Sequence, residues 1–167
     1  ASIALQTDDG IETEHPATIA GNELSATLIG LKADTEYTIE ISASLDGTDH
    51  RSDPQTFVTG YAPSSIPDMN LTEHADGSER TGFLVTSVIK TTSMAIILDQ
   101  DLDMVWWHVP EAEECVISRV VLTRDRSSVL YLVELPADET TPWKNELVRV
   151  SLDGTEVQTL DLTDGHH

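Results

Sequence analysis

Apolar and polar residues alternate along most of this chain, which is the period of strands with one buried face. The alternating segments are short and rich in Thr, Ile and Val, residues that favour strands. In the first part of the chain these segments are 2–7, 23–31, 36–45 and 55–60. The pattern predicts four half-buried antiparallel strands there.

Two Asp-Gly pairs follow strand-like segments and predict tight turns. Asp46-Gly47 comes directly after segment 36–45, and Asp153-Gly154 comes after segment 145–152. Aspartate and glycine tolerate the positive φ that two-residue hairpin loops require. Each pair therefore predicts a hairpin.

The same alternation continues after residue 82, with starts roughly ten residues apart. The segments are 83–90, 94–99, 104–109, 116–123, 128–135, 145–152 and 156–162. The nearest candidate for a helix, 110–115, is too short to be stable. Evenly spaced antiparallel strands are typical of sandwiches, barrels and propeller blades, so the sequence predicts an all-β fold.

Pro63 and Pro67 interrupt the strand pattern between the two halves. Proline fixes φ and lacks the backbone N–H that a sheet needs, so a strand cannot run through this stretch. We expect a first domain over 1–60, a linker over 61–67 and a second domain over 68–167.

The amino-acid composition limits the kinds of molecule that this protein can bind. Against 30 Asp and Glu stand 9 Lys and Arg, a formal net charge of −21. Nucleic-acid and anionic-membrane binding depend on Lys and Arg, and no window approaches the roughly 18 apolar residues of a membrane helix. We therefore expect neither a nucleic-acid partner nor membrane insertion. A single cysteine, Cys115, excludes an intramolecular disulfide and CxxC metal knuckles.

Residues 23–60 resemble the second half of a fibronectin type III domain. The segment GLKADTEY places Leu31 before a turn and Tyr37 at the family's corner tyrosine, and TFVTG matches the closing strand. The resemblance implies a β-sandwich in which residues 2–7 form a middle strand. The sandwich is then incomplete at its N-terminus, with its front strands removed or supplied by another segment.

Residues 61–167 are similar to the start of bacterial arylsulfotransferase-type proteins. Ile96–Asp99 and Val105–Trp107 match the apolar strand, Asp-rich turn and Val-Trp strand of the family's first blade. ELVRVSLDGTEVQTLDL resembles a propeller hairpin, and the terminal DGHH resembles the start of a His-bearing blade segment. The resemblance implies a small sandwich before a six-bladed propeller, in an extracellular or periplasmic protein.

Residues 68–167 can hold at most two blades of about 40 residues each. We therefore expect a fragment, completed by the remainder of the same polypeptide or by a second fragment. The alternative is that 61–167 closes as a sandwich of its own.

The resemblance implies transfer of a sulfuryl group from a phenolic sulfate to a phenol through a transiently sulfated histidine. His166 and His167 are the candidate catalytic residues, because imidazole is both nucleophile and proton carrier near neutral pH. The same pair also fits a trimmed purification tag or a frayed end, and the family's covalent histidine lies on a later blade. The fragment alone is therefore expected to be inactive, and no cofactor is indicated.

Asp99, Asp101 and Asp103 alternate as the carboxylates of calcium loops do. The loop glycine and distant Glu of an EF-hand are missing, and such runs are more often polar strand connections, so no metal site is assigned. His108 and Cys115 flank a Pro-Glu loop, where a buried free thiol is the usual outcome.

Trp106 and Trp107 are expected on opposite faces of one strand. The natural contacts for an anion are four arginines, of which the two in the TRDRS turn are expected to face solvent. They are Arg119, Arg124, Arg126 and Arg149.

A different class of function fits the same pattern. The chain can be an extracellular binding or adhesion module without catalysis, since both folds serve that role. A third hypothesis is that the chain is an assembly subunit whose missing strands come from a neighbouring copy by strand addition.

Overall fold

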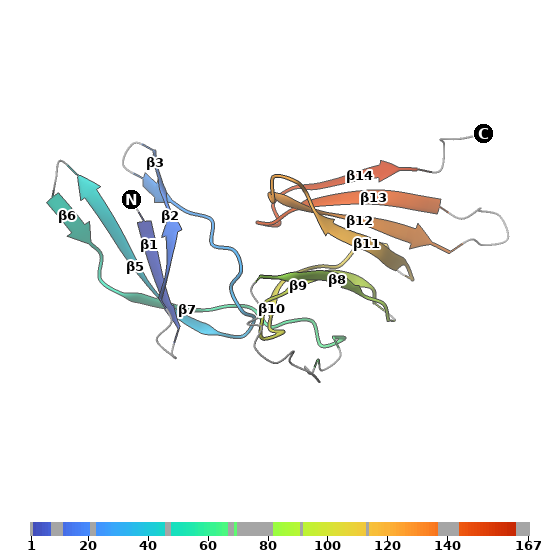
Figure 1. The fold of residues 1–167 in the computed structure, drawn as a ribbon, viewed down its shortest axis with the longest axis horizontal. Helices are drawn as coiled ribbons and strands as arrows, with labels where there is room; N and C mark the ends of the chain where they lie inside the picture. The colour runs from blue at the N-terminus through green and yellow to red at the C-terminus, as the bar shows by residue number, and fades with distance from the viewer. Residues whose placement is uncertain are drawn as a thin grey trace. The chain divides into compact units, whose positions relative to one another are not determined.

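The computed structural model divides the chain into two compact units, Ala1–Tyr61 and Ala62–His167. It describes residues 2–7, 12–20, 23–45, 48–66, 69, 82–90, 92–112, 114–136 and 144–162. These residues form fourteen strands and no helix (Figure 1), which confirms the predicted all-β fold class. No membrane-spanning helix is found among them.

The first unit contains one antiparallel sheet of five strands in the order β2-β1-β5-β6, with β7 also paired to β5. These strands are β1 (Ser2–Thr7), β2 (Glu12–Pro16), β5 (Glu36–Leu45), β6 (Thr48–Arg51) and β7 (Gln55–Val58). A separate pair joins β3 (Thr18–Ala20) to β4 (Glu23–Ser25).

The strand predictions for 2–7 and 36–45 are confirmed, whereas the prediction for 23–31 is wrong after Ser25. Strands β2, β3 and β6 were not predicted. Glu12–Pro16 contains no large aliphatic residue and no Phe, Trp or Tyr that could give an alternating pattern, and every residue of β6 is exposed. Pairing with a neighbouring strand, rather than burial, defines such segments.

Strands β6 and β7 lie along the same edge of β5. Leu45 pairs with Thr48, which leaves two residues between the strands, as the Asp46-Gly47 hairpin prediction requires; the pair itself lies outside the described residues. Between β6 and β7, Ser52 keeps contact with β5: its N–H donates to the Ile41 carbonyl at 2.9 Å, and its Oγ accepts from Ile41 N at 3.0 Å.

Tyr37 anchors the loop that precedes β5. Its side chain is buried and stacks on Phe57 of β7, with ring centroids 5.7 Å apart. The Lys32 N–H donates to Tyr37 Oη at 2.8 Å, and Thr59 Oγ1 donates to the Lys32 carbonyl at 2.6 Å. The tyrosine hydroxyl therefore ties a loop five residues upstream to the start of its own strand.

The second unit contains two antiparallel meanders. The first is a three-stranded sheet in the order β10-β9-β8, and the second is a four-stranded sheet in the order β11-β12-β13-β14. Their strands are β8 (Leu84–Val88), β9 (Met94–Leu98), β10 (Met104–His108), β11 (Val116–Leu122), β12 (Ser128–Leu135), β13 (Lys144–Ser151) and β14 (Val157–Asp161). All seven strand predictions are confirmed to within two residues at each end.

Strand β9 is buried along its whole length because both of its faces are covered. Ala95 and Ile97 belong to a cluster with the inward residues of β12 and β13. Met94, Ile96 and Leu98 point the other way, into a second cluster. Ala62 and Ile66, which fall within the expected linker, pack against this second cluster, so that stretch contributes to the core of the second unit.

The four-stranded sheet has a second face that carries an apolar row. Leu132 pairs with Leu147, and Leu147 pairs with Leu160, so their side chains lie side by side across three strands. Leu160 is 59% exposed, and Val121, on the same face of β11, is 51% exposed. We call these four residues, Val121, Leu132, Leu147 and Leu160, the outer face.

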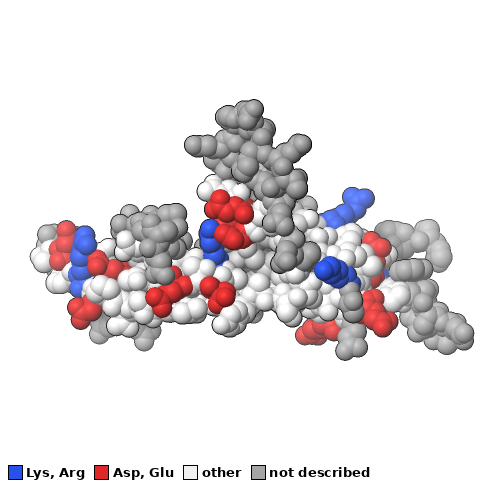
Figure 2. All heavy atoms as spheres, turned by 90° about the horizontal axis from the view of Figure 1, so that it is seen from below, with Lys and Arg blue, Asp and Glu red and all other residues white. Residues whose placement is uncertain are grey.

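Figure 2 shows acidic side chains scattered over the molecular surface in view, with few basic ones between them.

The β11–β12 and β13–β14 connections are built alike. Thr123 N donates to Ser128 O at 2.9 Å, and Arg126 N donates to Thr123 O at 2.9 Å. The β13–β14 turn repeats this pattern, with Ser151 N donating to Glu156 O at 3.0 Å and Gly154 N to Ser151 O at 2.9 Å. Each loop thus has four residues, so the prediction of a two-residue loop at Asp153-Gly154 is wrong.

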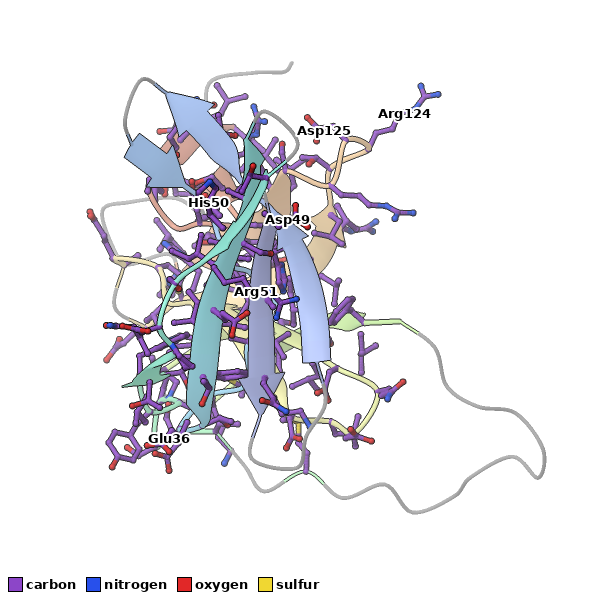
Figure 3. All side chains as sticks on the ribbon, turned by 90° about the vertical axis from the view of Figure 1, so that its left-hand side faces the viewer. Glu36, Asp49, His50, Arg51, Arg124 and Asp125 are labelled. Atoms are coloured by element: carbon purple, nitrogen blue, oxygen red, sulfur yellow. The ribbon has the colours of Figure 1, made fainter. Side chains whose placement is uncertain are left out.

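An aspartate organises each turn. Asp125 Oδ1 accepts from Thr123 Oγ1 at 2.6 Å, and Asp153 Oδ1 accepts from Ser151 Oγ at 2.6 Å (Figure 3 labels Asp125). The turns differ at the left-handed position, where φ is 57° at Arg126 and 71° at Gly154. Only the second turn has the residue that adopts this backbone without cost.

Replacing Arg126 with glycine is expected to raise the free energy of unfolding of the second unit by up to about 1 kcal/mol, because a left-handed non-glycine residue is strained. Replacing Gly154 with alanine is expected to lower it by about the same amount, and since nothing lies within 4 Å of the added Cβ, the backbone alone is responsible. Urea denaturation followed by tryptophan fluorescence measures both changes. A loss of stability in Arg126→Gly would show that the arginine side chain, and not its backbone, governs the turn.

Candidate functional site

A hydrogen-bonded pair, the half-buried His108 and the buried Tyr131, joins the two meanders of the second unit. Tyr131 of β12 is fully buried, and its Oη lies 2.6 Å from Nδ1 of His108 of β10. The two rings are 5.9 Å apart, and the His108 ring also stacks on Trp106 at 6.4 Å. Tyr131 belongs to the first core cluster, and Trp106 packs against it.

Burial decides the protonation state of this pair. It lowers the pKa of His108 from its ordinary value of 6.5, against a smaller opposing effect of the Glu111 charge. Burial also raises the pKa of the Tyr131 phenol, with a smaller contribution from Cys115. At neutral pH the histidine is therefore neutral and the phenol protonated, and we assign the Tyr131 O–H as donor to His108 Nδ1.

Cys115 lies in the same core cluster but does not form a nucleophile with His108. Burial raises the pKa of its thiol, which keeps the sulfur protonated and unreactive. Its carbonyl accepts a hydrogen bond from the buried Ser93 hydroxyl at 2.7 Å. The expectation of a buried free thiol is confirmed. A hollow of about 360 Å³ opens beside it, lined by Thr92, Ser93, Val109, Pro110, Glu111, Ala112, Glu114 and Cys115.

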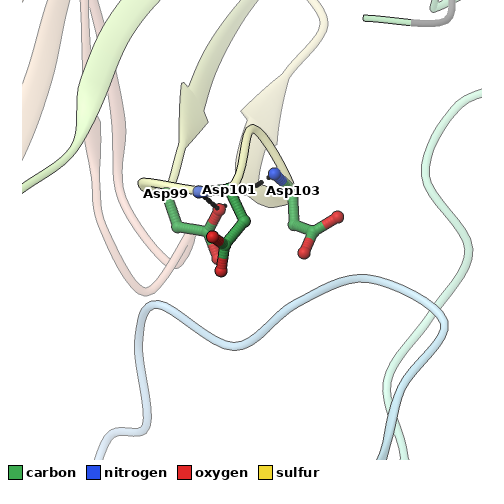
Figure 4. Close-up of side chains that lie close together, drawn as sticks. All are labelled: Asp99, Asp101 and Asp103. Atoms are coloured by element: carbon green, nitrogen blue, oxygen red, sulfur yellow. Dashed lines mark hydrogen bonds between the residues drawn. The ribbon is translucent and has the colours of Figure 1, made fainter. Parts of the chain in front are cut away.

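The three alternating aspartates form the connection between β9 and β10 (Figure 4). Asp99 Oδ1 accepts hydrogen bonds from the backbone N–H groups of Asp101 and Asp103, both at 2.9 Å. Side-chain oxygens of the three residues lie within 4.8 Å of one another. Hard cations prefer such oxygens, so among the described residues these are the ones that could hold a metal ion. Asp99 also shapes the turn itself, as expected of a polar strand connection.

The two tryptophans of β10 lie on opposite faces, as predicted. Trp106 packs against the first core cluster and Trp107 against the second. The candidate catalytic residues His166 and His167 lie outside the described residues.

Two of the four predicted anion-contacting arginines meet at one place. Arg124 and Arg149 line a shallow hollow at the β11–β12 turn, together with Thr123 and Asp125. Hydrogen bonds from Thr123 and Ser127 lower the pKa of Asp125 to about 2. Arg119 stands apart, at an irregularity in β11 where its φ is 54°.

Sequence reasoning missed the contact between His108 and Tyr131. The residues are 23 positions apart on different sheets, and nothing in the local pattern links them. The signal that was present is a tyrosine in the apolar register of a buried strand, since a buried phenol needs a hydrogen-bond partner.

Replacing His108 with glutamine is expected to flatten the dependence of stability on pH between about pH 7 and pH 5. Below 6.5 the unfolded chain binds a proton at this histidine before the folded chain does, since the folded pKa is lowered. The free energy of unfolding of the native protein therefore falls as the pH falls through this window, whereas glutamine does not titrate. Denaturation at several pH values measures the difference between the two proteins. Equal slopes would contradict the assigned neutral state of His108.

The described residues form a two-unit all-β protein. A scan against protein-family models and searches of the curated proteins and of the solved structures find no match to this chain. Its function must therefore be argued from its own residues.

Proposed function

We propose that this chain is the amino-terminal portion of an extracellular or periplasmic arylsulfotransferase-like protein. The whole protein would move a sulfuryl group from a phenolic sulfate to a phenol through a histidine. The observation that carries the proposal is the architecture of the second unit, in which one antiparallel meander packs on the next. Stacked meanders of this kind are the building principle of propeller blades.

The first unit adds support. Tyr37, with its hydroxyl bonded to the backbone five residues upstream, has the geometry of a tyrosine corner, a feature of immunoglobulin-like sandwiches. Strand β1 lies between β2 and β5, as expected for a middle strand. A sandwich-like unit followed by stacked meanders is the order that the resemblance implies.

The outer face of the four-stranded sheet supports continuation of the stack. Its apolar row lies on the side opposite the first core cluster, where Val121 and Leu160 are exposed and Leu132 and Leu147 are half-buried. A blade stabilises its faces by packing against neighbours on both sides. The occupant that we propose for this face is a further antiparallel meander of the same protein.

In this proposal the described residues serve as scaffold. His108 is bound to Tyr131, and Cys115 is held as a buried thiol, so neither is poised to react. His166 and His167 remain the candidate catalytic residues of this chain. Guanidinium and imidazole groups of the completed protein would hold the sulfate oxygens while the histidine is sulfated.

The test is release of nitrophenol from nitrophenyl sulfate by the longer protein that contains this sequence. Release that requires added phenol, and that is lost when both His166 and His167 are replaced by alanine, is the expected result. The chain of 167 residues alone should give no turnover. Absence of turnover by the longer protein would refute the enzyme proposal.

A second candidate function is a non-catalytic binding or assembly module. Strand β14 favours it: all five of its residues are exposed, and it forms one edge of its sheet. An exposed edge can accept a strand from another molecule. Sedimentation velocity of the chain separates the two candidates, because strand addition between copies would give concentration-dependent dimers that Thr159→Pro abolishes.

A further inference from the structure

Basic residues are scarce in this chain, and three of them lie at one end of the four-stranded sheet. Only 9 of the 167 residues are Lys or Arg, against 30 Asp and Glu. Arg124 and Arg126 both stand in the β11–β12 turn, and Arg149 lies on β13, paired in register with Leu130 of β12. Such grouping creates a local positive field on an acidic protein.

The hollow at this turn, lined by Thr123, Arg124, Asp125 and Arg149, has a volume of about 570 Å³. Arg149 Nε donates to Ser128 Oγ at 3.1 Å, which fixes the arginine across the neighbouring strand. The N–H groups on its two terminal nitrogens are then in a fixed position to donate to a ligand. Arg124 reaches outward from the turn beside Asp125 (Figure 3).

One carboxylate, that of Asp125, also lines the hollow, and the charge of Arg149 acts on it. Asp125 accepts hydrogen bonds from Thr123 Oγ1 at 2.6 Å and from Ser127 N at 3.2 Å, so the structure of the turn engages it. Against this one negative charge, two guanidinium groups line the hollow, those of Arg124 and Arg149. The net local charge is positive.

The backbone of this turn is strained at Arg126. This residue occupies a left-handed position, φ 57°, that its twin turn fills with Gly154. The turn itself would be more stable with glycine at this position. Replacing Arg126 with glycine therefore removes a nearby positive charge without weakening the turn.

We propose that this hollow is a binding site for a tetrahedral oxyanion group, the sulfate or phosphate of a monoester ligand. Forked guanidinium donors match the oxygens of such groups, and two or more of them around one anion give charge-assisted hydrogen bonds. The site lies on the surface of the second unit and involves no turnover. Arg149 is in register with Leu130 and lies two residues from Leu147 of the outer face, so the site is at the edge of the surface proposed to receive the next meander. Binding there requires no sulfuryl transfer, and its test uses this chain alone.

The test is a titration of the whole chain with inorganic sulfate and inorganic phosphate, followed by nuclear magnetic resonance at constant ionic strength in chloride. Saturable shifts of the backbone signals of residues 123–127 and of Arg149 are expected. Arg124→Gln and Arg149→Gln should each weaken binding by about two- to fivefold, as expected for exposed charged contacts. Arg119→Gln is the matched control, because Arg119 is also exposed and left-handed on β11 but does not line the hollow.

Glucose 6-sulfate and glucose 6-phosphate distinguish the two sources of the oxyanion, and saturable binding of either one at the same residues supports the site. Shifts that do not saturate would overturn the proposal. Equal weakening in Arg119→Gln would also overturn it, because the effect would then be general screening. Circular dichroism of each variant verifies that it remains folded, and Arg126→Gly, expected to be more stable yet to bind more weakly, keeps the proposal testable if the other variants misfold.

Discussion

Replacing Tyr131 with alanine is expected to lower the free energy of unfolding of the second unit by about 3–5 kcal/mol. The side chain is fully buried in the first core cluster, where its ring packs beside His108. Alanine would leave a large cavity and remove the donor to His108 Nδ1. All three tryptophans of the chain lie in residues 62–167, so fluorescence during urea denaturation reports on this unit.

Two further variants separate the causes of this effect. Tyr131→Phe keeps the ring and removes the hydroxyl, so it should cost only about 1 kcal/mol, the usual value of one hydrogen bond. Phe83→Ala is the surface control, because Phe83 lies in the same unit and is 61% exposed, and it should change stability by less than about 0.5 kcal/mol. A cost for Tyr131→Phe as large as for Tyr131→Ala would show that the hydrogen bond, and not packing, holds the meanders together.

Replacing Ile96 with alanine is expected to cost about 2–5 kcal/mol of unfolding free energy in the same unit. Ile96 is 0% exposed and lies in the second core cluster, on the central strand of the three-stranded sheet. Both faces of that strand are covered, so the surroundings have little freedom to close the cavity. The midpoint of urea denaturation measures the change.

Ile89 provides the matched control for this prediction. It follows strand β8 of the same sheet and is 59% exposed. Ile89→Ala removes the same atoms, and because its side chain faces solvent, the expected cost is below about 0.5 kcal/mol. Similar losses in Ile96→Ala and Ile89→Ala would mean that the second core cluster does not stabilise the unit as described.

The positions of most strands follow from the local pattern of residues. Segment 36–45 alternates apolar and polar residues and is a strand over that same range, and the mostly apolar segment 128–135 is also a strand over its predicted range. The predicted strand over 23–31 ended early at Ser25, and the polar strand β6 was missed. Alternation reports burial of one face, whereas pairing along an exposed edge leaves no such pattern.

The candidate sites also differ in whether their residues are close together in the sequence. The aspartate turn at 99–103 is local, because Asp99 bonds to backbone groups two and four residues ahead, and the sequence pattern located it. The meeting of Arg124 with Arg149, and of His108 with Tyr131, depends on which strands lie side by side.

The sequence by itself determined the all-β class, the acidic surface and the positions of most strands, including all seven of the second unit, since these depend on neighbours within a few residues. Only the tertiary structure decided that β9 is covered on both faces and that an arginine hollow opens at one turn. The reason is that strand order and sheet packing bring together residues far apart in the chain, and short-range patterns carry no information on those distances.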